Sequence, residues 1–231
     1  VRDIVFDVGP YYKPFKTYEK IFAEARSIDI LAEVTLSRGI GYLLEQNYLK
    51  AIEEFKKLLP IGPESKFFQE ADRYIRQALI ALVDKYAKQD GNLPILYSYS
   101  EFISFPVRDI KNAQTLLQVG EAYQAIGMFS EAVKLYEKVK AVDSQKNYRD
   151  RIFLKLGQIH LENLSYDEAL LVGRTFLKNY PRSKWVPDAM MILADALKGN
   201  EDFAAALTAY EELLVKSEDK AQVHFLIGET Y

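Results

Sequence analysis

Residues 113–144, AQTLLQVGEAYQAIGMFSEAVKLYEKVKAVDS, constrain the fold more than any other stretch, because small and large apolar residues alternate there at fixed spacings. Gly120 and Ala132 are small where two helix backbones would have to approach closely. Between the two predicted helices, residues 127–130 provide a glycine turn and a serine, Ser130, that we expect to cap the second helix. The large residues expected to fill the gaps beside the small ones are Leu116, Tyr123 and Tyr136. The stretch therefore predicts a helical hairpin.

This spacing recurs along the chain and predicts an array of such hairpins. Gly120, Gly157, Ala194 and Gly228 follow one another at intervals of 37, 37 and 34 residues, and Gly39 with Ala51 and Phe55 gives an earlier copy. We expect each unit to be stable only when stacked on its neighbours. The predicted division is 1–31, a lead-in and partial repeat helix; 32–65, a repeat; 66–112, an irregular aromatic-rich helical hairpin; 113–149, 150–186 and 187–220, three repeats; and 221–231, a truncated repeat.

Two places depart from the pattern. Arg38 stands where an aliphatic residue is usual, so its contact is expected to be either polar or made by the aliphatic stem. Residues 66–112 lack the small-residue spacing, and we expect one long helix at about 66–88 and a second at about 94–104.

Near the start of the chain, residues 13–28 carry apolar residues at intervals of three and four, which predicts an amphipathic helix covering the first full repeat.

Composition excludes several classes of partner and chemistry. The 231 residues carry a net charge of -3, which provides no basic footprint for nucleic acid. The chain has no cysteine, so disulfides and thiolate zinc sites are excluded. No uncharged apolar run approaches the roughly 18–20 residues that a membrane span needs. Because the chain begins without methionine and its last residues fall within a repeat motif, we expect it to be a fragment or a processed form of a longer protein.

Catalytic chemistry has few candidate residues. The two histidines, His160 and His224, stand at repeat positions expected to face a packed interface. Neither zinc-protease spacing nor a phosphate-binding glycine loop occurs. The paired carboxylates Glu53-Glu54 and Glu211-Glu212 are expected on solvated helix faces. We therefore predict a non-enzymatic protein with no catalytic residue, no metal ligand and no cofactor.

The small-residue spacing resembles the tetratricopeptide repeat, with Leu116, Val119, Gly120 and Tyr123 on its first-helix motif and Ala132 and Tyr136 on its second. Residues 179–189, NYPRSKWVPDA, are similar to junctions in bacterial outer-membrane assembly lipoproteins and Tol-Pal-associated periplasmic proteins. The resemblance implies an all-α fold, a right-handed superhelical array of antiparallel helix pairs. It also implies a protein-binding scaffold in the periplasm or cell envelope, with the cytoplasm as the alternative location.

Family resemblance also places a partner-binding groove along the first helix of each repeat. The residues that it assigns to the groove are Leu117, Glu121, Gln124, Leu154, Gln158, Met191 and Asp195. This set mixes apolar and acidic side chains, so a basic or amphipathic protein segment is the expected partner.

Aromatic residues of the 66–112 hairpin allow two interpretations. Tyr97, Tyr99 and Phe102 either fill the junction between unlike repeats or form an exposed hot spot for a partner. The predicted function is an interaction scaffold that binds a peptide or protein. The alternative is a structural spacer or self-assembly module, associating with further copies through uncapped repeat ends.

Overall fold

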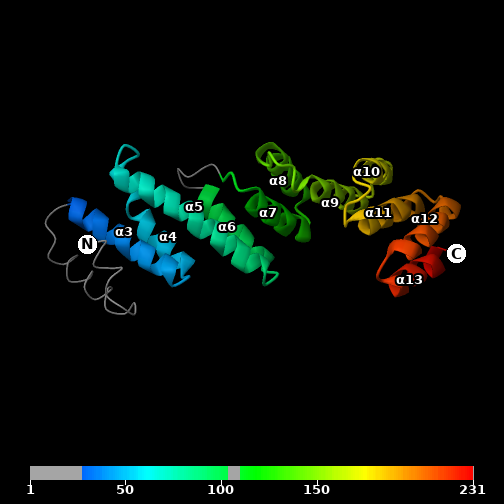
Figure 1. Ribbon diagram of the computed structural model, residues 1–231, viewed down its shortest axis with the longest axis horizontal. Helices are drawn as coiled ribbons and strands as arrows, with labels where there is room; N and C mark the ends of the chain where they lie inside the picture. Colours follow the sequence, from blue (N-terminus) through cyan, green and yellow to red (C-terminus); the bar gives the residue numbers. More distant parts are fainter. Residues whose placement is uncertain (1–27, 104–109, 231) are drawn as a thin grey trace. The chain divides into compact units, whose positions relative to one another are not determined.

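The computed structural model describes residues 28–103 and 110–230 (Figure 1). Within these ranges the chain forms eleven α-helices and one short 3-10 helix, with no strand. None of these helices combines the length and apolar content needed to cross a bilayer. The predicted helix at 13–28 lies outside the described residues except for its last position, and the lead-in at 1–12 lies wholly outside them.

The helices follow one another as pairs joined by short turns. Their bounds are α3 Ile28–Leu44, α4 Tyr48–Lys56, η1 Leu59–Ile61, α5 Lys66–Ala87, α6 Asn92–Ile103, α7 Ala113–Ala125, α8 Phe129–Val142, α9 Arg149–Glu162, α10 Tyr166–Asn179, α11 Val186–Gly199, α12 Phe203–Lys216 and α13 Lys220–Thr230. This arrangement confirms the predicted all-α fold built from adjacent helix pairs.

The first compact unit extends to Ala122. Within it α3 packs on α4, α4 on α5, and α5 on α6. At the α3–α4 contact, a Cβ added to Gly39 would lie 2.3 Å from the ring of Phe55. That ring is fully buried and stacks on Tyr74, with centroids 5.3 Å apart. A glycine is therefore needed at this position because the aromatic side chain occupies the space that a larger residue would take.

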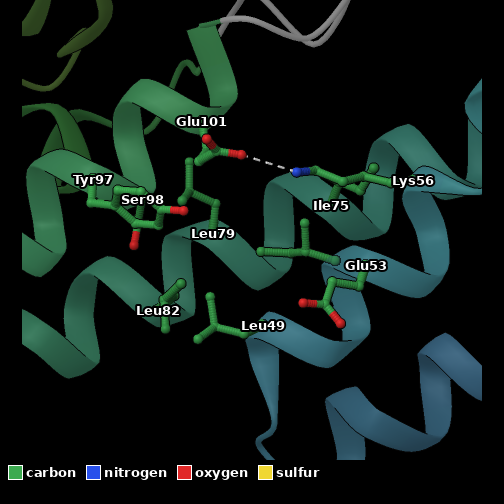
Figure 2. Close-up of a pocket in the computed structure, with 10 residues that line it drawn as sticks. Leu49, Glu53, Lys56, Ile75, Leu79, Leu82, Tyr97, Ser98 and Glu101 are labelled. Atoms are coloured by element: carbon green, nitrogen blue, oxygen red, sulfur yellow. Dashed lines mark hydrogen bonds and ion pairs between the residues drawn. The ribbon is translucent and has the colours of Figure 1, made fainter.

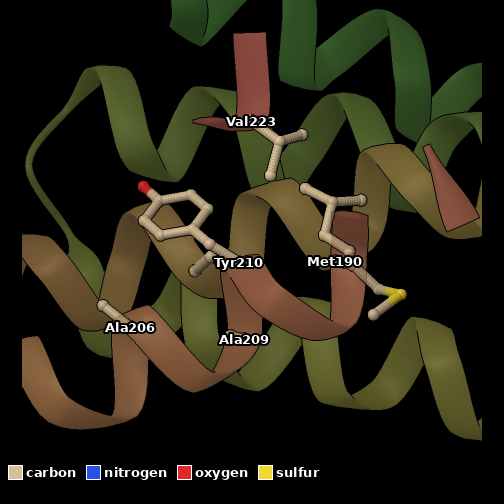
Figure 3. Packing of buried hydrophobic residues seen from close by; sticks show 7 residues of the cluster. Met190, Ala206, Ala209, Tyr210 and Val223 are labelled. Atoms are coloured by element: carbon tan, nitrogen blue, oxygen red, sulfur yellow. The ribbon is translucent and has the colours of Figure 1, made fainter. Parts of the chain in front are cut away.

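The second compact unit begins at Tyr123 and contains α8 to α13. Its C-terminal core surrounds Tyr210 of α12, which is fully buried together with Ala206 and Val223 and close to Met190 (Figure 3). A neighbouring cluster contains Phe176 of α10. The small residues Ala194 and Ala206 of the repeat spacing thus lie in the core around Tyr210, whereas Gly228 is exposed.

Turns within the hairpins share one backbone feature, a residue with positive φ. Gly127 has this conformation between α7 and α8, with φ of 77°, and Leu164 has it between α9 and α10, with φ of 58°. The glycine turn at 127 is therefore confirmed. The predicted cap is wrong, because α8 begins at Phe129 and Ser130 lies inside the helix.

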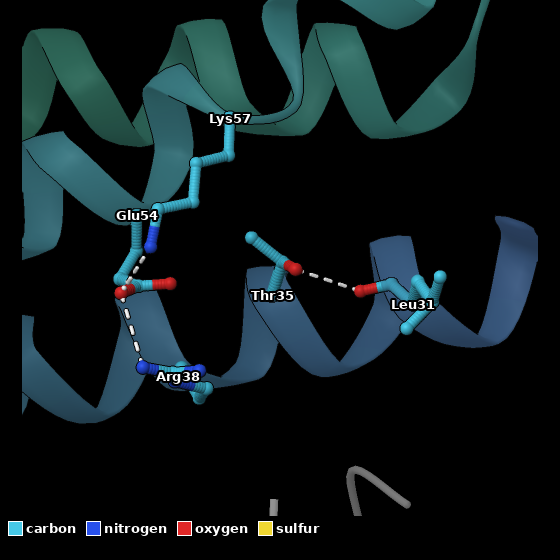
Figure 4. A network of polar contacts seen from close by, with 5 residues as sticks. All are labelled: Leu31, Thr35, Arg38, Glu54 and Lys57. Carbon is cyan, nitrogen blue, oxygen red and sulfur yellow. Dashed lines mark hydrogen bonds and ion pairs between the residues drawn. The ribbon is translucent and has the colours of Figure 1, made fainter. Parts of the chain in front are cut away.

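An ion-pair network centred on the buried Glu54 connects α3 with α4 (Figure 4). Glu54 Oε1 accepts hydrogen bonds from Arg38, at 3.2 Å, and from Lys57, at 2.7 Å. Glu54 is only 6% exposed, so its predicted place on a solvated face is wrong, whereas Glu211 and Glu212 are exposed as expected. Of the two contacts considered for Arg38, the structure has the polar one, because Glu54 on the second helix of the same hairpin faces it.

Candidate partner-binding surfaces

Predicted groove residues differ in how accessible they are. Leu117 on α7 is 1% exposed and Leu154 on α9 is 3% exposed, so the prediction that they face a partner is wrong. Both lie on the apolar stripe of their helix, which points into the core. Glu121, Gln158 and Met191 are half-buried and keep part of their surface accessible.

Two other groove residues are held by tyrosines of the following helix. Gln124 Oε1 accepts a 2.9 Å hydrogen bond from the Tyr136 hydroxyl, and Asp195 Oδ1 accepts a 2.5 Å bond from the Tyr210 hydroxyl. Burial raises the pKa of the Asp195 carboxyl above its ordinary value and outweighs the opposite effects of this hydrogen bond and of Lys198. Burial, followed by the hydrogen bond to Asp195, also raises the pKa of Tyr210. Asp195 therefore links α11 to α12, and its place in a groove stays a prediction.

A polar cleft of about 350 Å³ opens between α5 and the start of α7. Most residues of its lining carry an amide, hydroxyl or carboxylate group, although the surface that they expose in the cleft is mostly carbon: Gln77, Ile80, Ala81, Asp84, Asn112, Gln114, Thr115 and Gln118. Asn112 fixes one end, because its Oδ1 accepts a 2.8 Å hydrogen bond from the backbone N–H of Thr115 in the first turn of α7. We call this site the polar cleft.

Asp84 organises the polar cleft. Its carboxylate accepts hydrogen bonds from Gln114 Nε2, at 3.3 Å, and from Gln118 Nε2, at 3.4 Å. The Lys88 ammonium, 2.6 Å away, lowers the pKa of Asp84, and the bond from Gln118 acts in the same direction. Gln118 Oε1 is buried and has no hydrogen-bond partner in the part of the chain that the structure describes. This acceptor lies beside the cleft, and a bound group could satisfy it once the Gln118 side chain turns toward the opening.

Sequence reasoning missed most of this cleft. It placed no groove residue on α5, because the 66–112 hairpin lacks the repeat spacing from which groove positions are counted. Gln118 and Asp84 are 34 residues apart. The only available signal was the concentration of amide side chains at the start of α7, at 112, 114 and 118.

The aromatic residues of α6 separate in the structure. Tyr99 is 7% exposed, so of the two interpretations the structure supports packing for this residue and excludes an exposed hot spot. Tyr97 is 65% exposed and borders an apolar cleft of about 110 Å³ between α4 and α6 (Figure 2). The side chain of Phe102 lies outside the described residues.

Residues 28–103 and 110–230 contain no cluster of side chains suited to binding a metal ion. No group of three or more histidine and acidic side chains there is placed to hold a metal ion. His160 is half-buried, whereas His224 on α13 is exposed, so the predicted packing position of His224 is wrong. Nothing in the described part covers that face of α13, where a Cβ added to Gly228 would also meet no atom within 4 Å.

Two stretches of the chain match family models described as tetratricopeptide repeat. One match covers residues 115–148 and the other residues 193–231. The first coincides with most of the hairpin predicted at 113–149.

Several solved structures have a fold similar to that of this chain. MamA matches with a TM-score of 0.53 and 19% identity, covering 80% of this chain and 96% of its own. A tetratricopeptide repeat protein of Thermus thermophilus matches at 0.50 and 16%, over 86% of this chain and 98% of its own. PilF of Pseudomonas aeruginosa matches at 0.51 and 19%, covering 86% of each chain. At these identities the likeness concerns the fold alone.

One curated protein is also similar in sequence. The mouse voltage-dependent calcium channel subunit alpha-2/delta-3 is 22% identical over 213 residues. The match covers 88% of this chain, which spans about 18% of the length of that relative.

Proposed function

We propose that this chain of tetratricopeptide repeats is a non-enzymatic interaction scaffold that binds an extended segment of a protein partner in the polar cleft. Tetratricopeptide repeats stack into surfaces that bind proteins, and the two matched stretches support that general role. The observation that carries the specific proposal is Gln118 Oε1, a buried acceptor without a partner in the described residues, at the side of an open cleft.

An extended peptide is the ligand that suits this chemistry. Its backbone N–H groups can donate to Gln118 Oε1 and to Asp84, and its carbonyl groups can accept from the amides of Gln77 and Gln114. The cleft volume falls within the range of about 300–1,000 Å³ seen for ligand sites. Glu121, Gln124, Gln158, Met191 and Asp195 remain predicted groove residues, with Leu117 and Leu154 supporting them from the core.

The test begins with a selection of peptides from a displayed random library on the wild-type chain. Selected peptides are then measured by fluorescence anisotropy against Gln118→Leu, which removes both polar groups of the side chain at similar size. We expect the affinity to fall about ten-fold or more, since a polar group left without its partner is costly. The matched control is Gln89→Leu, an exposed glutamine beyond the end of α5.

Equal binding by the wild type and Gln118→Leu would place the peptide elsewhere and contradict the proposal. Failure of the wild type to enrich any peptide would contradict it as well. Hydrogen exchange of both variants verifies that α5 and α7 remain folded.

A structural role is the second candidate, and one surface favours it. α13 exposes Phe225 beside the open space at Gly228. A second copy of the chain stacking on this face would make it a self-assembly module. Sedimentation of the wild type against Phe225→Glu separates the two functions, because only self-assembly predicts a mass that depends on concentration and is lost in the variant.

The periplasmic or cell-envelope location stays a prediction. It rests on the junction at 179–189, and the cytoplasm remains its alternative. Fractionation of cells that express the natural gene at its natural level would test it.

A further inference from the structure

A second cleft of the first unit lies between α4 and α6, with another face of α5 as its floor (Figure 2). We call it the α4–α6 notch. Its floor consists of Ile75, Leu79 and Leu82, all buried side chains of α5. Ile52 of α4 continues the apolar wall. The notch is therefore an apolar depression that exists before any partner binds.

Its size selects the kind of group that fits. About 110 Å³ is well below the roughly 300 Å³ at which small-molecule sites begin. A dry apolar cavity of about 150 Å³ is enough for one benzene molecule. The notch thus has room for a single apolar side chain rather than for a cofactor.

Two exposed apolar residues flank the opening. Leu49 on α4 is 48% exposed and Tyr97 on α6 is 65% exposed. Single exposed apolar residues are common on protein surfaces, but here both border the same preformed depression. A side chain inserted between them would bury Leu49 and the ring of Tyr97 together with its own apolar surface.

The charged residues at the rim of the notch indicate which charge the partner should carry beside its apolar side chain. Lys56 Nζ and Glu101 Oε2 are 3.3 Å apart and form an ion pair that joins α4 to α6 at one end. Ser98 is satisfied, because its hydroxyl donates a 2.7 Å hydrogen bond to the backbone carbonyl of Pro94. Glu53 is exposed and forms no ion pair within the described residues. One uncompensated negative charge therefore faces whatever enters the notch.

We propose that the α4–α6 notch is a docking site for a basic amphipathic segment of a protein partner. One leucine, isoleucine or methionine of the partner inserts between Leu49 and Tyr97, and a lysine or arginine beside it pairs with Glu53. This site does not depend on the polar cleft, since the two share no residue and differ in chemistry.

The experiment titrates the whole chain, labelled at isoleucine and leucine methyl groups, with three synthetic peptides and follows the methyl signals by NMR. The first peptide has three copies of Ala-Lys-Leu-Ala, the second replaces each lysine by glutamate, and the third replaces each leucine by serine. We expect only the first to shift the methyl signals of Ile75, Leu79 and Leu82.

Protein variants complete the test. Glu53→Lys is expected to weaken binding of the first peptide at least about ten-fold, because two like charges would then face each other. Tyr97→Ser should also weaken it by removing one wall of the opening. Glu45→Lys is the matched control: it makes the same charge change at an exposed glutamate in the turn between α3 and α4, outside the notch.

Three results would overturn the proposal: no methyl shift with the first peptide, equal shifts with the glutamate peptide, or equal weakening by Glu45→Lys and Glu53→Lys. Methyl shifts that follow protein concentration alone and vanish in Tyr97→Ser would show that a second copy of the chain occupies the notch, and would also overturn it. Peptides selected for the polar cleft serve as a separate readout, so each site can fail without the other.

Discussion

Glu54 shows how a single side chain can connect two helices of a repeat. It lies on α4, it is nearly inaccessible to solvent, and it accepts hydrogen bonds from Arg38 of α3 and from Lys57. Its partner Arg38 is itself only 19% exposed along the side chain. An ion pair in such a place is stabilising only while both partners are present, because a buried charge without its partner is unfavourable.

Replacing Glu54 by alanine should therefore destabilise the first unit. We expect the free energy of unfolding in urea to fall by about 2 kcal/mol, since Arg38 would keep its charge in a largely buried site without an acceptor. Glu53→Ala, one position away and exposed, is the control and should change stability by less than about 0.5 kcal/mol. Equal losses in the two variants would show that the network contributes nothing specific.

Asp195 gives a pH dependence whose sign follows from its burial. Its pKa is raised above the ordinary 3.8, so protonation of the Asp195 carboxylate stabilises the folded state. This contribution to stability is fully present below pH 3.8 and is lost as the pH rises through the pKa of the folded protein. Asp195→Asn keeps an acceptor for Tyr210 and cannot ionise, so it should lose this dependence.

We expect the stability of Asp195→Asn relative to the wild type to be greater at about pH 7 than at about pH 3, as measured by urea unfolding at both values. Glu211→Gln on α12 serves as the control, because that carboxylate is exposed. A difference between variant and wild type that is independent of pH, or larger in acid, would contradict the assigned cause.

Individual contacts were predictable only where the sequence spacing fixes them. The contact between Gly39 and Phe55 follows from the repeat and is present. Leu117 and Leu154 were misplaced because one helical position rotates a side chain by about 100°. The place of Tyr99 stayed open because α6 carries apolar residues on several faces, so spacing alone does not choose between core and surface. The polar cleft depends on Asp84 and Gln118, which no local pattern connects.

Helices and turns were easier to predict than individual contacts. α5 begins at Lys66 and ends at Ala87, close to the predicted 66–88, because Ser65 caps its start and the 90–92 turn follows its end. α6 begins at Asn92, two residues before the predicted start at Pro94, since a proline is tolerated in the first turn of a helix. The misplaced Ser130 cap arose in the same way, from a helix that starts earlier than its polar residue.

Two glycines at equivalent repeat positions, Gly39 and Gly228, allow a prediction with a matched control. In Gly39→Ala the added Cβ would collide with the Phe55 ring, which is fully buried against Tyr74 and has little freedom to move. We expect a loss of about 1–3 kcal/mol in thermal or urea unfolding. Gly228 occupies the equivalent repeat position, but a Cβ added there would meet no atom within 4 Å. Gly228→Ala should therefore stabilise α13 by up to about 1 kcal/mol.

Gly39→Ala and Gly228→Ala are expected to change the free energy of unfolding in opposite directions, and this difference is the test. If both substitutions destabilise equally, the collision with the Phe55 ring does not account for the loss at Gly39. Phe55→Leu combined with Gly39→Ala tests the contact directly, because a smaller side chain at 55 should recover part of the loss.

At the scale of the whole molecule, the described helices pack most strongly on helices adjacent or one apart in chain order. Stability in such arrays is approximately a sum of local terms between neighbours. The polar cleft and the α4–α6 notch lie in the first unit, whereas Asp195 and Tyr210 lie in the second. Damage to one unit should therefore leave the binding surfaces of the other intact.

Hydrogen exchange measured by mass spectrometry tests this expectation. Tyr210→Ala removes a fully buried ring from the core of α11 to α13, a change of about 3–5 kcal/mol, so amides of those helices should exchange faster while α3 to α6 keep their protection. Phe55→Ala should give the reverse pattern, because the ring it removes is buried between α3, α4 and α5. Under the same conditions, Tyr210→Ala should still bind peptides selected on the polar cleft. Faster exchange in both units after either substitution would instead show one cooperative unit, and loss of peptide binding in Tyr210→Ala would then have to be interpreted as unfolding of the whole array.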